Sequence, residues 1–130
     1  MQVRAMTEED FIQVSNWLSI RKWPMPPTEA SLPDSAFVCY DDNGLLAAAW
    51  AYNTNADIIM LSWMCTPPDS DKDGMAGLVE IAKYVRDIDR TDSAIMFMTT
   101  SERLAKYLSK EFRGTKPRSC YNTFWTKGDK

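Results

Sequence analysis

The spacing of apolar residues changes near the start of the chain from a strand-like period to a helical one. Residues 2–6 alternate weakly and predict a short strand, whereas the apolar residues of 8–21 recur every three or four positions, as in an amphipathic helix. Thr7 precedes this helix and three acidic residues come directly after Thr7, which is typical of a helix N-terminus. The segment 23–34 holds four prolines and is expected to be an irregular linker.

Three strands are predicted in the middle of the chain, at 36–40, 45–52 and 58–65. Asn43 and Gly44 lie between the first two strands, and this pair accepts positive φ at both central positions of a hairpin turn. The third strand is apolar on both faces, as expected for a central strand that helices cover on each side.

The rest of the chain predicts helices and strands in alternation, at 75–88, 94–98, 102–111 and 121–125. Ser101 is a suitable N-cap for the second of these helices. The whole order is β-α-β-β-β-α-β-α-β, which predicts an α/β (α+β) fold with a mixed, mostly antiparallel sheet and helices on both faces. Residues 1–130 contain no repeat and no signal of a second domain, so we expect a single domain.

The composition excludes several classes of function. The chain has no histidine, which excludes His-based metal sites and histidine-activated nucleophiles, and we expect no metal. A net charge of −3 argues against nucleic acid as a partner, and no apolar run reaches the roughly 18 residues that a membrane span needs. Three scattered cysteines, none in a C-x-x-C pair, indicate reduced thiols, so we expect a soluble protein of the cytoplasm.

The charge is unevenly distributed along the chain. Residues 101–130 carry eight Lys or Arg against three acids, a balance of +5, so the first hundred residues carry −8. The basic C-terminal segment is either an anion-binding surface or a solvated face.

The segment from Cys65 to Ala76 is the most distinctive part of the sequence. A strand that breaks at Pro67 and Pro68 and re-enters as a helix near Gly74 presents free backbone N–H groups, which suit an anion such as a pyrophosphate. The turn nevertheless carries three aspartates against one lysine, in the order Asp69, Asp71, Lys72 and Asp73. These acids would repel a diphosphate, and they equally fit an ordinary turn in which they stabilise a helix start.

The order of elements and two local patterns resemble the GNAT acetyltransferase superfamily. In the turn, family members typically read Val-x-Pro, three further residues, and then x-x-Gly-x-Gly/Ala. The last of the three further residues, directly before x-x-Gly, is typically Arg or Gln. Four residues of this chain fall at those spacings, namely Thr66, Pro68, Gly74 and Ala76. Asp71 stands at the position of the family's Arg or Gln.

The second pattern lies at the end of the last predicted helix. Tyr107 and Phe112 match the spacing of the family's Tyr-x-x-x-Gly-Phe, with Glu111 in place of the glycine. Three stretches are also similar to short GNAT-like proteins encoded by phages and prophages, at 32–38, 47–54 and 61–63.

The resemblance implies a binding site for acetyl-CoA. Its pantetheine arm would pair with the strand end near Met64 and Thr66. Its pyrophosphate would lie on the backbone N–H groups of the turn, from Asp71, Lys72, Asp73 and Gly74 to Met75 and Ala76. Tyr107 would protonate the departing thiolate as a general acid. No carboxylate lies on 58–65 to act as base, so a water relayed by the backbone or by Ser62 would take that role.

The same residues also fit purely structural roles. Tyr107 fits the inner stripe of its helix, and Cys65 fits a buried position better than a nucleophilic one because no histidine can activate it. Trp50 and Tyr52 share one face of their strand. Together with Trp63 they form either an aromatic floor for an acyl acceptor or a part of the core.

Two functions from different classes follow. The first is a diverged, acetyl-CoA-dependent N-acetyltransferase that acts on an unknown acceptor. The second is a non-catalytic structural or interaction protein, either a component of a phage particle or a binder of a host protein. The second is motivated by the missing Arg or Gln, by the three aspartates of the turn and by the missing strand carboxylate. If a phage encodes the protein, we expect it in the host cytoplasm or in the virion.

Overall fold

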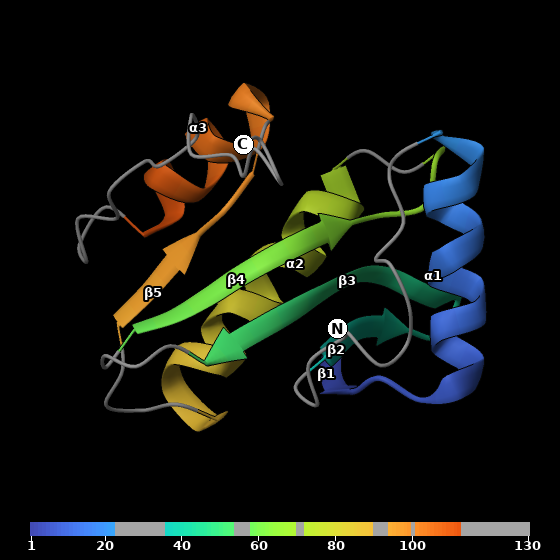
Figure 1. The fold of residues 1–130 in the computed structure, drawn as a ribbon, viewed down its shortest axis with the longest axis horizontal. Helices are drawn as coiled ribbons and strands as arrows, with labels where there is room; N and C mark the ends of the chain where they lie inside the picture. The colour runs from blue at the N-terminus through green and yellow to red at the C-terminus, as the bar shows by residue number, and fades with distance from the viewer. Residues whose placement is uncertain (23–35, 54–57, 70–71, 90–93, 100, 113–130) are drawn as a thin grey trace, which may run out of the picture.

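A computed structural model of the chain describes residues 1–22, 36–53, 58–69, 72–89, 94–99 and 101–112 (Figure 1). Its elements are, in chain order, β1 (Gln2–Ala5), α1 (Glu8–Ile20), β2 (Ala36–Asp41), β3 (Gly44–Asn53), β4 (Ile58–Cys65), α2 (Lys72–Tyr84), the short π-helix η2 (Val85–Asp89), β5 (Ala94–Phe97) and α3 (Glu102–Glu111).

The described strands form a five-stranded sheet in the order β1-β2-β3-β4-β5 (Figure 1). The first three pairs of neighbours are antiparallel, whereas β4 and β5 are parallel because α2 and η2 cross over between them. The prediction of an α+β fold with a mixed, mostly antiparallel sheet is therefore confirmed. The predicted linker at 23–34 and the predicted strand at 121–125 lie outside the described residues.

Helices pack on both faces of the sheet, and each face has its own apolar cluster. On the first face, α1 packs through Val14, Trp17 and Leu18 against strand residues that include Trp50 and Cys65; we call this the α1-side cluster. On the other face, α2 and α3 cover a larger set of buried side chains, which we call the α2-side cluster; it includes Leu61, Ile81 and Leu108. In Figure 1, α2 lies behind the sheet.

Neighbouring residues of β3 contribute to opposite clusters. Ala47 and Ala49 belong to the α2-side cluster, whereas Ala48 and Trp50 belong to the α1-side cluster. This division follows from the two-residue period of a strand, and it explains why β3 is apolar along most of its length.

The helix starts are capped as their sequences predict. Thr7 and Asp10 form a reciprocal capping box at α1, in which the Asp10 N–H donates to Thr7 Oγ1 at 3.2 Å and the Thr7 N–H donates to the Asp10 carboxylate at 2.9 Å. Arg4 of β1 also donates to the Asp10 carboxylate, at 3.1 Å through Nη2. At α3, the side chain of Ser101 accepts a hydrogen bond from the Leu104 N–H at 3.1 Å.

Two local predictions need correction. The helix after the acidic turn begins at Lys72 rather than at residue 75, and its α-helical geometry ends at Tyr84, directly before η2. In the hairpin between β2 and β3, Gly44 has a φ of 125° but Asn43 does not have a positive φ, so the prediction of positive φ at both positions is wrong. The Asn43 N–H instead donates to Asp41 Oδ1 at 2.8 Å, which stabilises the turn locally.

Candidate functional site

The C-terminal half of β4 contains a bulge centred on Trp63. Ala48 of β3 pairs with Cys65, and Trp50 pairs with Ser62, so two residues of β4 lie opposite one residue of β3. Trp63 has a φ of 52°, in the left-handed region that a bulky side chain rarely occupies. Such a conformation costs on the order of 1–3 kcal/mol, so packing around Trp63 must hold it in place.

The bulge changes which face of the sheet the following side chains reach. Leu61 belongs to the α2-side cluster, and strict alternation would place Trp63 and Cys65 on that same face. Instead, Trp63 packs against the α1-side cluster, Cys65 belongs to it, and Met64 lies in the α2-side cluster. Trp63 is thereby brought to the face that carries Trp50.

The bulge coincides with the point at which β4 leaves β5. Among the described residues, the parallel pairing runs from Ile58 opposite Ala94 to Leu61 opposite Phe97. The Met98 N–H then donates to Leu61 O at 2.9 Å, while β4 itself continues to Cys65. Figure 1 shows the carboxyl ends of the two strands diverging.

The C-terminal end of β4 is buried, and the turn that follows it is exposed. Met64 and Thr66 are each 9% exposed and Cys65 is 2% exposed, whereas Pro68 and Asp69 are exposed. Burial raises the pKa of the Cys65 thiol to about 12, against an opposite effect of the positive charge of Arg21. Cys65 is therefore a protonated, buried thiol and not a nucleophile.

The predicted pyrophosphate loop is described in part. Lys72, Asp73 and Gly74 form the first residues of α2, so their N–H groups belong to the helix start, and Met75 and Ala76 follow in the next turn. Gly74 is buried and Asp73 is exposed, while Asp71 lies outside the described residues.

Arg21 joins this site from the C-terminal end of α1. Its Nη2 donates to Thr66 Oγ1 at 3.2 Å and to Pro67 O at 2.9 Å, directly after β4 ends. No local pattern predicts this contact, because Arg21 and Pro67 are 46 positions apart and belong to elements that the sheet brings together.

Tyr107 lies on the α2 side of the sheet. Its half-buried ring packs against the α2-side cluster, to which Leu61, Met64 and Phe97 also belong. The structure thus places Tyr107 in the same cluster as the residues at which β4 and β5 separate. Both the core role and the role of a proton donor beside a bound thioester remain compatible with this position.

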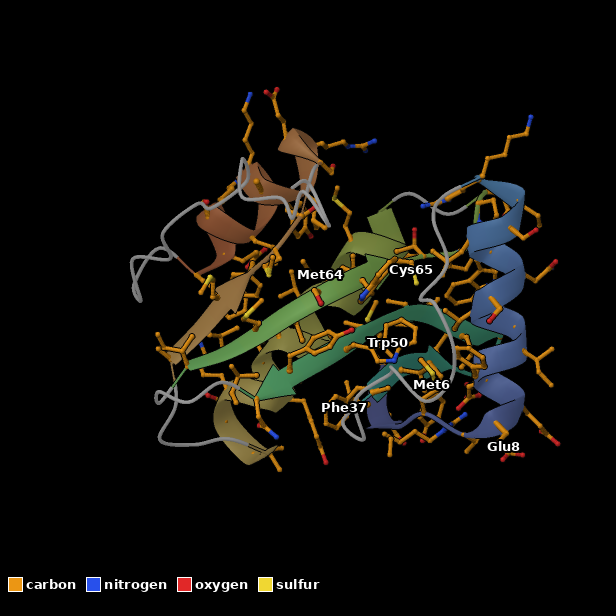
Figure 2. The ribbon with its side chains drawn as sticks, in the orientation of Figure 1. Met6, Glu8, Phe37, Trp50, Met64 and Cys65 are labelled. Carbon is orange, nitrogen blue, oxygen red and sulfur yellow. The ribbon has the colours of Figure 1, made fainter. Side chains whose placement is uncertain are left out.

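Three aromatic side chains lie on the α1 side of the sheet, opposite Tyr107. Trp50 is fully buried, and Tyr52 and Trp63 pack around the same α1-side cluster. Figure 2 shows Trp50 between Met6 and Cys65, which belong to or pack against that cluster. Among the residues that the structure describes, the Trp50 Nε1–H has no hydrogen-bond partner, a state that costs about 1–3 kcal/mol for a buried donor.

Two further properties concern only the described part of the chain. Its side chains form no group of three or more Asp, Glu or Cys that is placed to hold a metal ion. None of its helices combines the length and the apolar character that crossing a bilayer requires.

The chain was also compared with known proteins. No protein-family model matches it. No curated protein matches it either.

Proposed function

We propose that the chain is a GNAT-like domain that binds acetyl-CoA where β4 separates from β5. The observation that carries the proposal is the coincidence of the left-handed bulge at Trp63 with the end of the β4–β5 ladder at Leu61. A strand that has left its neighbour offers backbone groups to an extended ligand, which is how a pantetheine arm would pair with Met64 to Thr66. Strained backbone of this kind is concentrated at functional sites.

The adjacent helix start supports the same ligand. The first N–H groups of α2, at Lys72 to Gly74, lack partners within their own helix, so they suit the diphosphate of acetyl-CoA. The aspartates of the turn oppose this binding, which makes affinity the quantity to measure first.

The proposed reaction is transfer of an acetyl group from the thioester to an amine. The amine nitrogen attacks the thioester carbonyl, the C–S bond breaks, and the departing thiolate takes a proton from the Tyr107 hydroxyl. The proton that the amine loses passes to water, since β4 carries no carboxylate and Ser62 is its only hydroxyl. Tyr107 later regains a proton from solvent.

Calorimetric titration of the full chain with acetyl-CoA tests the proposal. We expect one molecule to bind per chain, and no detectable binding at millimolar ligand would remove the proposed function. Tyr107→Phe should leave acetyl-CoA affinity unchanged but slow thiol release, measured over a panel of small amines, by about 100-fold. Tyr84→Phe is the matched control, because Tyr84 is a half-buried tyrosine that packs beside Phe37 of the same cluster.

A second candidate function is a non-catalytic structural or interaction protein, in a phage particle or on a host protein. The burial of Met64, Cys65 and Thr66 favours it, because a strand end that is already packed leaves less room for a ligand. This function predicts that acetyl-CoA does not bind. It also predicts that the chain is found at fixed stoichiometry in purified particles or in a complex with a host protein, and its absence from both would contradict it.

A further inference from the structure

The outer face of α1 carries two exposed isoleucines and no charge between its ends. Ile12 is 70% exposed and Ile20 is 58% exposed, and they lie eight positions apart, which is about 12 Å along the helix. The other exposed residues between them are uncharged as well, namely Gln13, Asn16 and Ser19. The solvent face of a surface helix usually carries charged side chains, so this face differs from the usual pattern.

The two isoleucines are placed symmetrically about Asn16. Single exposed apolar residues are common, so the arrangement of these two matters more than their number. Ile12 lies four positions before Asn16 and Ile20 four positions after it, so the three residues form one row along the helix surface. If a second α1 crosses this row in the opposite direction at Asn16, the Ile12 of each copy meets the Ile20 of the other. A contact between identical copies about a two-fold axis needs such a self-complementary patch.

The charges at the ends of α1 favour the same antiparallel arrangement. Glu8 and Glu9 are exposed at the N-terminal end, and Lys22 is exposed just beyond the C-terminal end. In an antiparallel pair each acidic end lies beside the Lys22 of the other copy, whereas a parallel pair would place acid beside acid. Figure 1 shows α1 at one side of the molecule with no described element on its outer side, so a second copy can approach this face.

We propose that the chain forms a symmetric dimer through the outer face of α1, with the two helices antiparallel and Asn16 at the two-fold axis. The isoleucines supply apolar contact, and the Asn16 amides, which carry both donors and an acceptor, hydrogen-bond across the axis. A helix of 13 residues is only about 20 Å long, so the interface is small and the dimer weak, with a Kd of about 10–100 µM. Such a dimer is independent of the proposed function, because this face points away from the sheet.

Sedimentation equilibrium of the full chain, up to a concentration of about 1 mM, measures this association. Ile12→Glu and Ile20→Lys should each raise the Kd of the dimer by at least about tenfold, since each places two charges in the apolar contact. In the double variant Ile12→Glu/Ile20→Lys the new charges pair across the antiparallel contact, so it should associate more tightly than either single variant. Ile88→Glu is the matched control, because Ile88 is a 65% exposed isoleucine of η2, and it should change the Kd by less than about twofold.

Disulfide cross-linking tests the position of the two-fold axis. All variants carry Cys120→Ser, and the other two cysteines of the chain are buried. Asn16→Cys should give a covalent dimer under mild oxidation, because the two copies of residue 16 face each other. Gln13→Cys should not, since residue 13 would be offset from its own copy by about 9 Å along the helix, which is beyond the reach of a disulfide.

Three results would contradict this dimer. A chain that remains monomeric at about 1 mM overturns it and leaves the face to solvent or to a different protein. A dimer that Ile88→Glu weakens as much as Ile12→Glu does not depend on α1, and cross-linking through Gln13→Cys but not Asn16→Cys shows another register; each of these also overturns the proposal. Thermal unfolding of each variant checks the fold. If Ile12→Glu does not fold, Ile20→Lys and Asn16→Cys decide.

Discussion

Gly77 of α2 faces Ala47 of β3 so closely that a Cβ atom at position 77 would lie 3.0 Å from the Ala47 Cβ. The same Cβ would lie 3.3 Å from the Cβ of Leu46, so both contacts come from atoms attached directly to a strand backbone. Neither atom can rotate away. The absence of a side chain at Gly77 is therefore what allows α2 to lie flat on the sheet and to begin beside the end of β4.

Gly77→Ala is expected to lower the free energy of unfolding by about 1–2 kcal/mol, even though alanine is the better helix former. Denaturant unfolding measures this change. In the double variant Gly77→Ala/Ala47→Gly the contact is relieved, so the two substitutions should be coupled and cost less together than the sum of their separate effects. Additive effects would show that α2 can move away from β3 without penalty.

Because Arg4 and Thr7 donate hydrogen bonds to the Asp10 carboxylate, the free energy of unfolding should fall at acid pH. Burial alone would raise the pKa of the Asp10 carboxyl, but hydrogen bonds from Arg4 and Thr7 outweigh burial and place the pKa below its usual value of 3.8. A carboxylate whose pKa is lowered by folding contributes stability above its unfolded pKa, and this contribution is lost as the pH falls through the folded pKa. Urea unfolding should therefore show a loss of stability below about pH 4.

Asp10→Asn isolates this contribution. It should cost about 1–2 kcal/mol at pH 7 and progressively less as the pH falls through the lowered pKa of folded Asp10, because the wild-type carboxylate then becomes protonated. Asp87→Asn is the control: the Arg86 pairing also lowers the pKa of Asp87, but Asp87 is exposed. Equal effects of the two substitutions at pH 7 would contradict the importance of burying the Asp10 carboxylate within the capping box.

The indole N–H of Trp50 predicts an asymmetry between two buried tryptophans. Trp50→Phe and Trp17→Phe remove the same volume from the α1-side cluster, but Trp50→Phe also removes a buried donor that has no acceptor within the described part of the chain. We expect Trp50→Phe to cost at least about 1 kcal/mol less than Trp17→Phe in denaturant unfolding. A larger cost for Trp50→Phe would show that its N–H finds a partner in solution.

The two described cysteines should be inert in the folded protein. Burial raises the pKa of the Cys39 thiol to about 11 and that of the Cys65 thiol to about 12, so both remain protonated at pH 8. Labelling with a thiol reagent, followed by peptide mapping, should modify neither residue in native protein and both in urea. Rapid native labelling of Cys65 would show that the exit of β4 opens, and would bear directly on access to the proposed ligand site.

The elements that depend on neighbouring residues were predictable from the sequence. The start of α1 was predicted at Thr7 because its cap joins residues three positions apart. The interior position of β4, between β3 and β5, was predicted from its apolar residues, and the meander from the turn after Asp41. In each case the information lies within a few residues of chain, which is the range over which propensity and periodicity act.

The geometry of the candidate site was not predictable in the same way. An unbroken strand pattern from Ile58 to Cys65 would have placed Trp63 on the face of Leu61. Trp63 lies on the other face because β4 forms a bulge where it pairs with β3. The contact of Arg21 with Pro67 likewise has no local signal, because it joins the end of a helix to the end of a strand across the sheet.

The sequence by itself thus determined the order of the described helices and strands, which faces are apolar, and that the turn before α2 is acidic. The tertiary structure decided where β4 breaks its alternation, where β4 parts from β5, and that a cation from α1 is held at the edge of that turn. The physical reason is the range of the interactions involved. Capping and periodicity act within one or two turns of chain, whereas register, strain and the placement of Arg21 depend on packing between segments that the sequence keeps far apart.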